Sequence, residues 1–231
     1  MTIPIRLAEL LAANPECHMF GSGQHECRFG PPVDPAVLAR VEELAGVPLP
    51  ADYREFVTTI GDGGLGPYYG VMSLTEAMAQ VEATSGLASL GMDSPLTEDI
   101  SIGELMRMPA DWNEHVARLD TDPAYEAGWG RLQAEYMGAP WCQGRLPIAQ
   151  FGCGDWFFLI LRGPRRGTMW VDSLDSASGL YGLEVGFRTW YSRWLDDAID
   201  QATNLAYVRT PGGYLRYGDN RRQDRKGPVT S

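Results

Sequence analysis

The segment at residues 49–70 reads LPADYREFVTTIGDGGLGPYYG and joins an amphipathic stretch to a cluster of glycines. From Tyr53 to Ile60 its apolar residues stand at i, i+3, i+4 and i+7, which is the spacing of one buried helical stripe. We therefore predict a helix that opens at Leu49-Pro50 and ends where the glycines begin.

The glycines of this segment, at positions 61, 63, 64 and 66, follow the predicted helix. A phosphate-binding loop has the opposite order, because its glycines present the free N–H groups at a helix N-terminus. The C-terminal end of a helix carries partial negative charge, which repels phosphate. We therefore predict a turn, with Gly61 in the left-handed conformation that ends a helix and an extended segment at residues 68–72.

The remaining pattern predicts helices and an antiparallel sheet. Asp34-Pro35 is a typical helix start, and short runs rich in aromatic and β-branched residues predict a three-stranded meander. A strict helical stripe from Phe187 to Ile199 predicts a last helix that covers the sheet with its aromatic side chains. The expected helices lie at residues 5–13, 34–45, 75–90 with Thr75 as cap, and 123–137; the expected strands are residues 146–151, 156–161 and 168–172.

Charge is unevenly distributed along the chain. The net charge is −11, yet residues 209–226 hold six basic and two acidic residues, whereas ten carboxylates and three arginines lie between Asp93 and Glu135. An acidic protein is a poor ligand for nucleic acid, because that binding depends on neutralised phosphates. No apolar run has the length of a membrane helix. We expect no nucleic-acid or membrane partner, one domain over residues 1–208 with an acidic insertion at 91–140, and a basic tail at 209–231.

Four residues near the N-terminus are of the types that bind zinc: Cys17, His18, His25 and Cys27. They contain neither a Cys-x-x-Cys pair nor a His-x-x-x-His pair, and a polar loop explains them equally well. We therefore expect no metal, reduced thiols and a cytoplasmic protein.

No residue pattern indicates catalysis. Cys153 lies between two glycines and is far in sequence from each histidine, so we expect a turn residue and not a nucleophile. Asp172 follows a strand and is equally natural as a cap or turn residue. The pair Asp196-Asp197 is explained as a solvated helix face. We expect neither an enzyme nor a cofactor.

The chain resembles the SUKH superfamily, over about residues 34–82 and 146–200. The matching stretches include Gly70-Val71-Met72-Ser73-Leu74, read as a first strand and its exit, together with residues 146–149, 152–155 and 170–172. The positions that carry the resemblance as structural residues are Leu49, Pro50, Tyr53, Phe56, Gly61, Gly63, Gly64, Gly66, Gly154 and Trp170.

The resemblance implies an α+β fold in which helices pack against a mostly antiparallel sheet. Fungal members include a regulator of cell-wall synthesis, and bacterial members typically bind and neutralise toxins, often nucleases. The shared residues of the superfamily are mainly structural, so the resemblance implies no catalytic residue.

The acidic insertion is the expected contact surface. A toxin that binds phosphates presents basic surface, which an acidic protein occupies by electrostatic complementarity. We therefore expect a basic protein toxin as partner, and its contacts at Glu98, Asp99, Glu104, Asp111 and Glu114. Two alternatives stay open: these carboxylates are ordinary solvated groups, or the protein is a regulatory scaffold that binds several partners.

Overall fold

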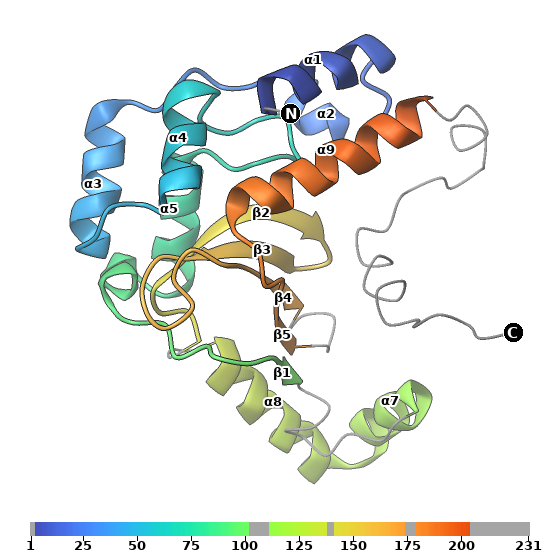
Figure 1. Cartoon of the computed structure of the whole chain (residues 1–231). Coiled ribbons are helices and arrows are strands. Elements are labelled where there is room, and N and C mark those ends of the chain that lie inside the picture. Colours follow the sequence, from blue (N-terminus) through green and yellow to red (C-terminus); the bar gives the residue numbers. More distant parts are fainter. Residues whose placement is uncertain (1–2, 102–110, 138–140, 174–178, 204–231) are drawn as a thin grey trace, which may run out of the picture.

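The computed structural model describes residues 3–101, 111–137, 141–173 and 179–203 of the chain. Its five strands form one antiparallel sheet of order β1-β5-β4-β3-β2, and helices pack around it, so the predicted α+β class is confirmed (Figure 1). In chain order the elements are α1 (Ile3–Ala13), α2 (Ser22–His25), α3 (Pro35–Ala45), α4 (Ala51–Thr59), α5 (Leu74–Thr84), the 3-10 helix η1 (Leu87–Gly91), β1 (Ile100–Ser101), α7 (Trp112–Thr121), α8 (Pro123–Met137), β2 (Arg145–Gly152), β3 (Asp155–Ile160), β4 (Met169–Ser173), β5 (Gly179–Gly182) and α9 (Phe187–Thr203).

The helix starts follow local capping chemistry. Asp34 caps α3 by accepting a hydrogen bond from the Ala36 N–H at 2.8 Å. Ser73 caps α5 in a reciprocal capping box with Glu76, so the predicted cap at Thr75 was wrong by two residues. That helix also ends earlier than predicted, at Thr84: Gly86 has a positive φ of 75°, outside the helical region, and the chain continues as η1.

The glycine cluster forms a turn, but its glycines act differently from the prediction. Gly61 is not left-handed; its missing side chain lets two backbone segments meet, because a Cβ there would lie 2.6 Å from the Gly30 carbonyl oxygen. The left-handed positions are Gly63 and Gly64, at φ of 83° and 102°. The predicted first strand is absent from this described segment: Val71 forms only an isolated bridge with Gly64.

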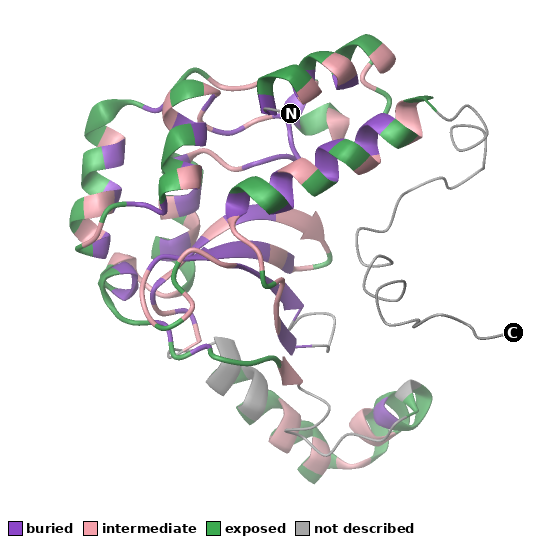
Figure 2. Ribbon diagram, in the orientation of Figure 1, coloured by how far each residue is buried: buried purple, intermediate pink, exposed green. Residues whose placement is uncertain are grey.

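The central strands are buried on both faces. All five residues of β4 and five of the six in β3 are buried, as Figure 2 shows in purple. One face of the sheet, with Phe157 and Leu159, packs in the main core against α9. The other face, with Phe158 and Trp170, forms a second cluster. The three predicted strands are present, and β1 and β5 extend the sheet on the β4 side.

The last helix, α9, supplies the largest part of the aromatic core. Phe187, Trp190 and Tyr191 are each at most 1% exposed, and the Tyr191 hydroxyl donates to the Leu65 carbonyl at 2.8 Å. The predicted aromatic stripe is therefore confirmed. Among the described residues, no helix combines the length and the apolar character that crossing a bilayer requires.

Candidate protein-binding surface

Helices α7 and α8 form an acidic arm, defined here as residues 111–137. The arm lies at the end of the molecule opposite α1 and α9 (Figure 1). Its sequence holds six carboxylates and two arginines, a net charge of −4. Where Figure 2 colours the arm by burial, most of its residues are exposed or intermediate. The arm is therefore a solvent-facing acidic surface at one end of the fold.

A small aromatic cluster holds the two helices of the arm together. The buried His115 of α7 contacts Tyr125 of α8, with 2.7 Å between its Nδ1 and the phenolic oxygen, and its ring lies 4.7 Å from that of Trp129. Burial lowers the pKa of His115, and the nearby Arg118 lowers it further. The Arg118 guanidinium itself lies over the Tyr125 ring at 4.1 Å. Arg118 also lies 3.9 Å from the Asp122 carboxylate in an ion pair within the arm, so the net charge of −4 comes from the other carboxylates.

Trp129 joins the arm to the sheet. Together with Trp141 it packs against the second cluster, whose buried members include Phe158 and Trp170. Trp129, from the segment expected to be an insertion, therefore contributes to the cover of the outer face of the sheet. This contact attaches the arm to the rest of the fold.

The five predicted contact residues have different surroundings. Asp99 accepts a hydrogen bond from the Gly182 N–H at 2.8 Å, and Asp111 caps α7 by accepting from the Asn113 N–H at 2.9 Å. Both carboxylates therefore have a structural role, although both residues are exposed. Glu98 and Glu114 are exposed, and neither has a side-chain hydrogen bond or ion pair with any described residue. Glu104 lies outside the described residues.

Two further carboxylates of the arm were missing from the sequence-based set. Asp120 and Glu126 are exposed and make no side-chain hydrogen bond or ion pair within the described ranges. For Glu126 part of the signal was present in the sequence, because the helix at residues 123–137 was predicted, but Asp120 lies in α7, which the sequence did not predict. The strongest contact candidates are now Glu114, Asp120 and Glu126.

Two residues that were weighed for catalysis are structural here. Asp172 of β4 forms an ion pair with Arg145 of β2 at 2.9 Å, and both side chains are at least 85% buried. The Arg145 guanidinium also lies 4.4 Å from the centre of the Phe158 ring. Cys153 is exposed in the β2–β3 turn, with a φ of 54° between Gly152 and Gly154. It is a turn residue.

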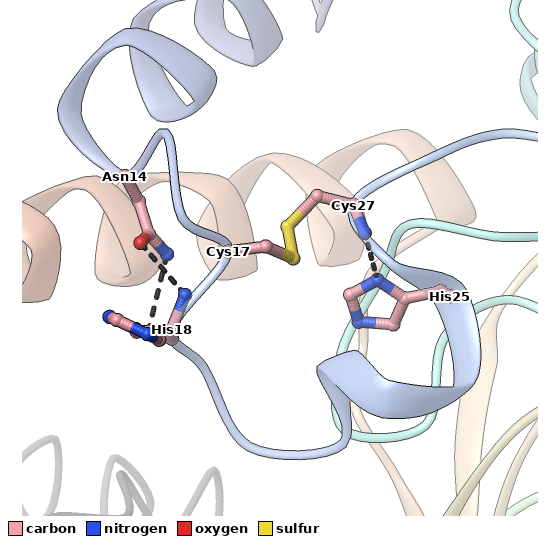
Figure 3. Close-up of a disulfide and its surroundings, with 5 residues drawn as sticks. All are labelled: Asn14, Cys17, His18, His25 and Cys27. Carbon is pink, nitrogen blue, oxygen red and sulfur yellow. Dashed lines mark hydrogen bonds between the residues drawn. A yellow bond between two sulfur atoms is a disulfide. The ribbon is translucent and has the colours of Figure 1, made fainter.

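The cysteine loop, residues 14–28, contradicts the expectation of reduced thiols. Cys17 and Cys27 form a disulfide with their Cα atoms 5.8 Å apart (Figure 3). The ten-residue separation gave no spacing signal, but α2 and the left-handed backbone of Cys17, Glu26 and Cys27 fold the loop back on itself. Burial lowers the pKa of the neighbouring His25.

Comparison with known proteins identifies the chain by family alone. Residues 32–191 match the family model described as the SMI1 / KNR4 family (SUKH-1). That match spans more than two thirds of the chain and includes both the glycine cluster and the acidic arm. No curated protein and no solved structure matches significantly.

Proposed function

The chain belongs to the SMI1 / KNR4 family (SUKH-1), and we propose that it is an immunity-type protein that binds and neutralises a basic protein toxin. The toxin in this proposal is a nuclease, and the chain acts by occupying its basic surface, without chemistry of its own. Binding would take place in the cytoplasm. The observation that carries the proposal is the acidic arm, on which Glu114, Asp120 and Glu126 are exposed and form no ion pair within the described residues.

Family membership supports a binding role. Proteins of this family are generally binding proteins without catalytic activity. The candidate nucleophile Cys153 occupies a turn, and Asp172 is held in a buried ion pair. The chemistry that the described surface offers is therefore charge, presented by α7 and α8.

Electrostatics supports a basic partner. A nuclease attracts a polyanion with clustered Lys and Arg, and a protein with several carboxylates on one surface competes for the same groups. Carboxylates that already form ion pairs contribute little to such binding, whereas unpaired ones keep their full charge for the partner. Glu114, Asp120 and Glu126 are unpaired within the described residues, which makes the arm the preferred contact surface.

The test is affinity capture from a lysate of the source cells, followed by assay of the captured protein. Wild-type chain is compared with Glu114→Lys/Glu126→Lys and with the control Glu43→Lys/Asp200→Lys, which changes the net charge equally on α3 and α9. We expect the wild type and the control to capture one basic protein whose nuclease activity the chain inhibits. We expect Glu114→Lys/Glu126→Lys to capture much less of this protein.

Other outcomes contradict parts of the proposal. Equal capture by all three proteins would exclude the arm as the contact surface. A captured protein without nuclease activity would reject the toxin class. Several sub-stoichiometric partners would favour the second reading of the family, a regulatory scaffold.

A further inference from the structure

The cysteine loop brings three metal-ligating side chains together. Ligand atoms of Cys17, His25 and Cys27 all lie within 4.8 Å of one another. Figure 3 shows the imidazole of His25 beside the disulfide, whereas His18 lies on the other side of the loop next to Asn14. Two sulfurs and one imidazole are a ligand set typical of zinc. The structure therefore selects three of the four candidate residues and leaves His18 out.

His25 already has the tautomer that a metal ligand needs. Its Nδ1 accepts a hydrogen bond from the Cys27 N–H at 3.0 Å, so this nitrogen carries a lone pair and the ring proton is on Nε2. Nδ1 thereby lies next to Cys27 and is the nitrogen that we take as the ligand atom. The residue is only 6% exposed, and Nε2 has no hydrogen-bond partner among the described residues. A disulfide alone gives no reason to bury this imidazole.

The loop is positioned by contacts other than the disulfide. The Leu65 N–H donates to the Arg28 carbonyl at 2.7 Å, and the Gly30 N–H donates to the Gly63 carbonyl at 3.1 Å. Gly21 packs so closely on the backbone of Tyr68 that a Cβ at position 21 would lie 2.0 Å from the Tyr68 carbonyl oxygen. These contacts attach the loop to the glycine cluster, so we expect the three ligands to stay close when the disulfide is reduced.

We propose that the reduced cysteine loop binds one Zn²⁺ ion through the thiolates of Cys17 and Cys27 and the imidazole of His25. Reduction breaks the S–S bond: a dithiol supplies two electrons and two protons and is itself oxidised to a disulfide. Zinc then displaces the two thiol protons and takes the Nδ1 lone pair, which frees the Cys27 N–H to donate to a thiolate. Oxidation to the disulfide removes two of the three ligands, so zinc binding and the disulfide exclude each other.

The geometry requires only a small adjustment. With Zn–S near ~2.3 Å and Zn–N near ~2.0 Å, the edges of the ligand tetrahedron are ~3.5–3.8 Å. Ligand atoms that already lie within 4.8 Å therefore need to move little, apart from the separation of the two sulfurs on reduction. Cys17 and Cys27 are partly buried and still reach solvent, which gives the ion an entry path. Water would take its fourth position.

The experiment uses the full chain with Cys142→Ser and Cys153→Ser, so that only the loop thiols remain. The reduced chain is titrated with Zn²⁺ against a chromophoric chelator, and near-UV circular dichroism reports the fold before and after the addition. We expect one Zn²⁺ per reduced chain and none in the oxidised chain. Cys17→Ser should abolish binding. His25→Ala should weaken it at least tenfold, since loss of even an outer-shell partner costs about 10–100-fold.

His18→Ala is the matched control, because it removes an exposed histidine of the same loop and should leave the zinc affinity unchanged. As a second readout, saturating zinc should slow the oxidation of the two thiols by glutathione disulfide at least tenfold. The proposal is overturned if the reduced chain takes up no zinc, whether it keeps its native spectrum or loses it without recovery on adding zinc. Equal losses in His18→Ala and His25→Ala would also overturn the ligand set.

Discussion

Phe157 and Phe158 are neighbours in β3, yet their rings belong to different clusters on opposite faces of the sheet. The ring centre of Phe157 lies 5.2 Å from that of Trp190 in α9. The ring centre of Phe158 lies 6.5 Å from that of Trp170, in the cluster against which Trp129 of the acidic arm packs. Both faces of the sheet therefore need a partner layer. The acidic arm contributes Trp129 to the outer cluster and presents Glu114, Asp120 and Glu126 to solvent at the same time.

Replacing Trp129 by alanine tests whether the arm is docked on the sheet. Because Trp129 is only partly buried, we expect its loss to lower the free energy of unfolding by about 1–3 kcal/mol, less than the ~3–5 kcal/mol of a fully buried aromatic. Trp190→Ala in the main core is the comparison. Denaturant unfolding followed by far-UV circular dichroism measures both. Equal losses, or no loss at Trp129, would contradict the two-layer arrangement.

Breaking the buried ion pair of Arg145 and Asp172 should lower the free energy of unfolding more than breaking a surface pair does. Removing one partner leaves the other charge buried, so Arg145→Met should cost about 3–5 kcal/mol of unfolding free energy. The double variant Arg145→Met/Asp172→Leu should recover much of that loss, because both buried charges are then gone. The exposed pair of Arg40 and Glu43 is the control, with an expected effect of ~0–1 kcal/mol. Additive losses in the double variant would show that the two side chains act separately.

The close approach at Gly64 makes a sharp prediction for the family's glycine cluster. A Cβ at Gly64 would lie 2.2 Å from the Arg28 carbonyl oxygen, and the residue has a φ of 102°. A residue other than glycine at such a φ costs about 1–3 kcal/mol, and the steric clash adds to this cost. Gly64→Ala should therefore be strongly destabilising. Gly130→Ala is the opposite case: nothing lies within 4 Å of its Cβ position in α8, so alanine should stabilise by roughly 0.5–1 kcal/mol. Thermal unfolding of the two variants distinguishes them.

Asp62 should make stability depend on pH. Burial raises the pKa of its carboxyl, the hydrogen bond from the Leu74 N–H lowers that pKa, and the charge of Glu76 raises it. A raised folded-state pKa means that the native state holds this proton more tightly than the unfolded chain does. The wild type therefore loses stability as the pH rises from the ordinary carboxyl pKa through the raised one.

Asp62→Asn cannot ionise and keeps a carbonyl oxygen to accept from Leu74. Its stability relative to the wild type should therefore improve as the pH rises from about 4 to 6, the range just above an ordinary carboxyl pKa. Denaturant unfolding at several pH values measures this difference. A constant difference across the range would contradict the raised pKa.

Much of this fold is predictable from local chemistry. The stripe of α9, the cap of α3 and the three central strands follow from side-chain spacing and turn residues, which act over a few positions. The continuous apolar run Trp156-Phe157-Phe158-Leu159-Ile160 predicted a strand by its length and composition, but its burial on both faces is visible only in the structure. Which segments cover the second face depends on tertiary packing, and for that reason the contribution of Trp129 was missed.

The wrong predictions, for Gly61 and for the loop cysteines, also depend on tertiary packing. Gly61 is needed for the approach of residues 29 and 30, which lie far from it in sequence, and the Cys17–Cys27 bond depends on a loop whose path no short motif specifies. The region of the contact surface was chosen from net charge and stays a prediction. The hydrogen bonds of Asp99 and Asp111 and the exposure of Asp120 and Glu126 required the structure.

The most direct test of the proposed function is the affinity of the purified chain for its captured basic partner, measured at about 50 and 200 mM salt, a range over which contacts that replace phosphates weaken strongly. We predict that wild type and Glu43→Lys/Asp200→Lys bind equally and weaken together with salt, whereas Glu114→Lys/Glu126→Lys binds at least tenfold more weakly at the lower salt. Equal affinity of all three proteins, unchanged by salt, would contradict the account.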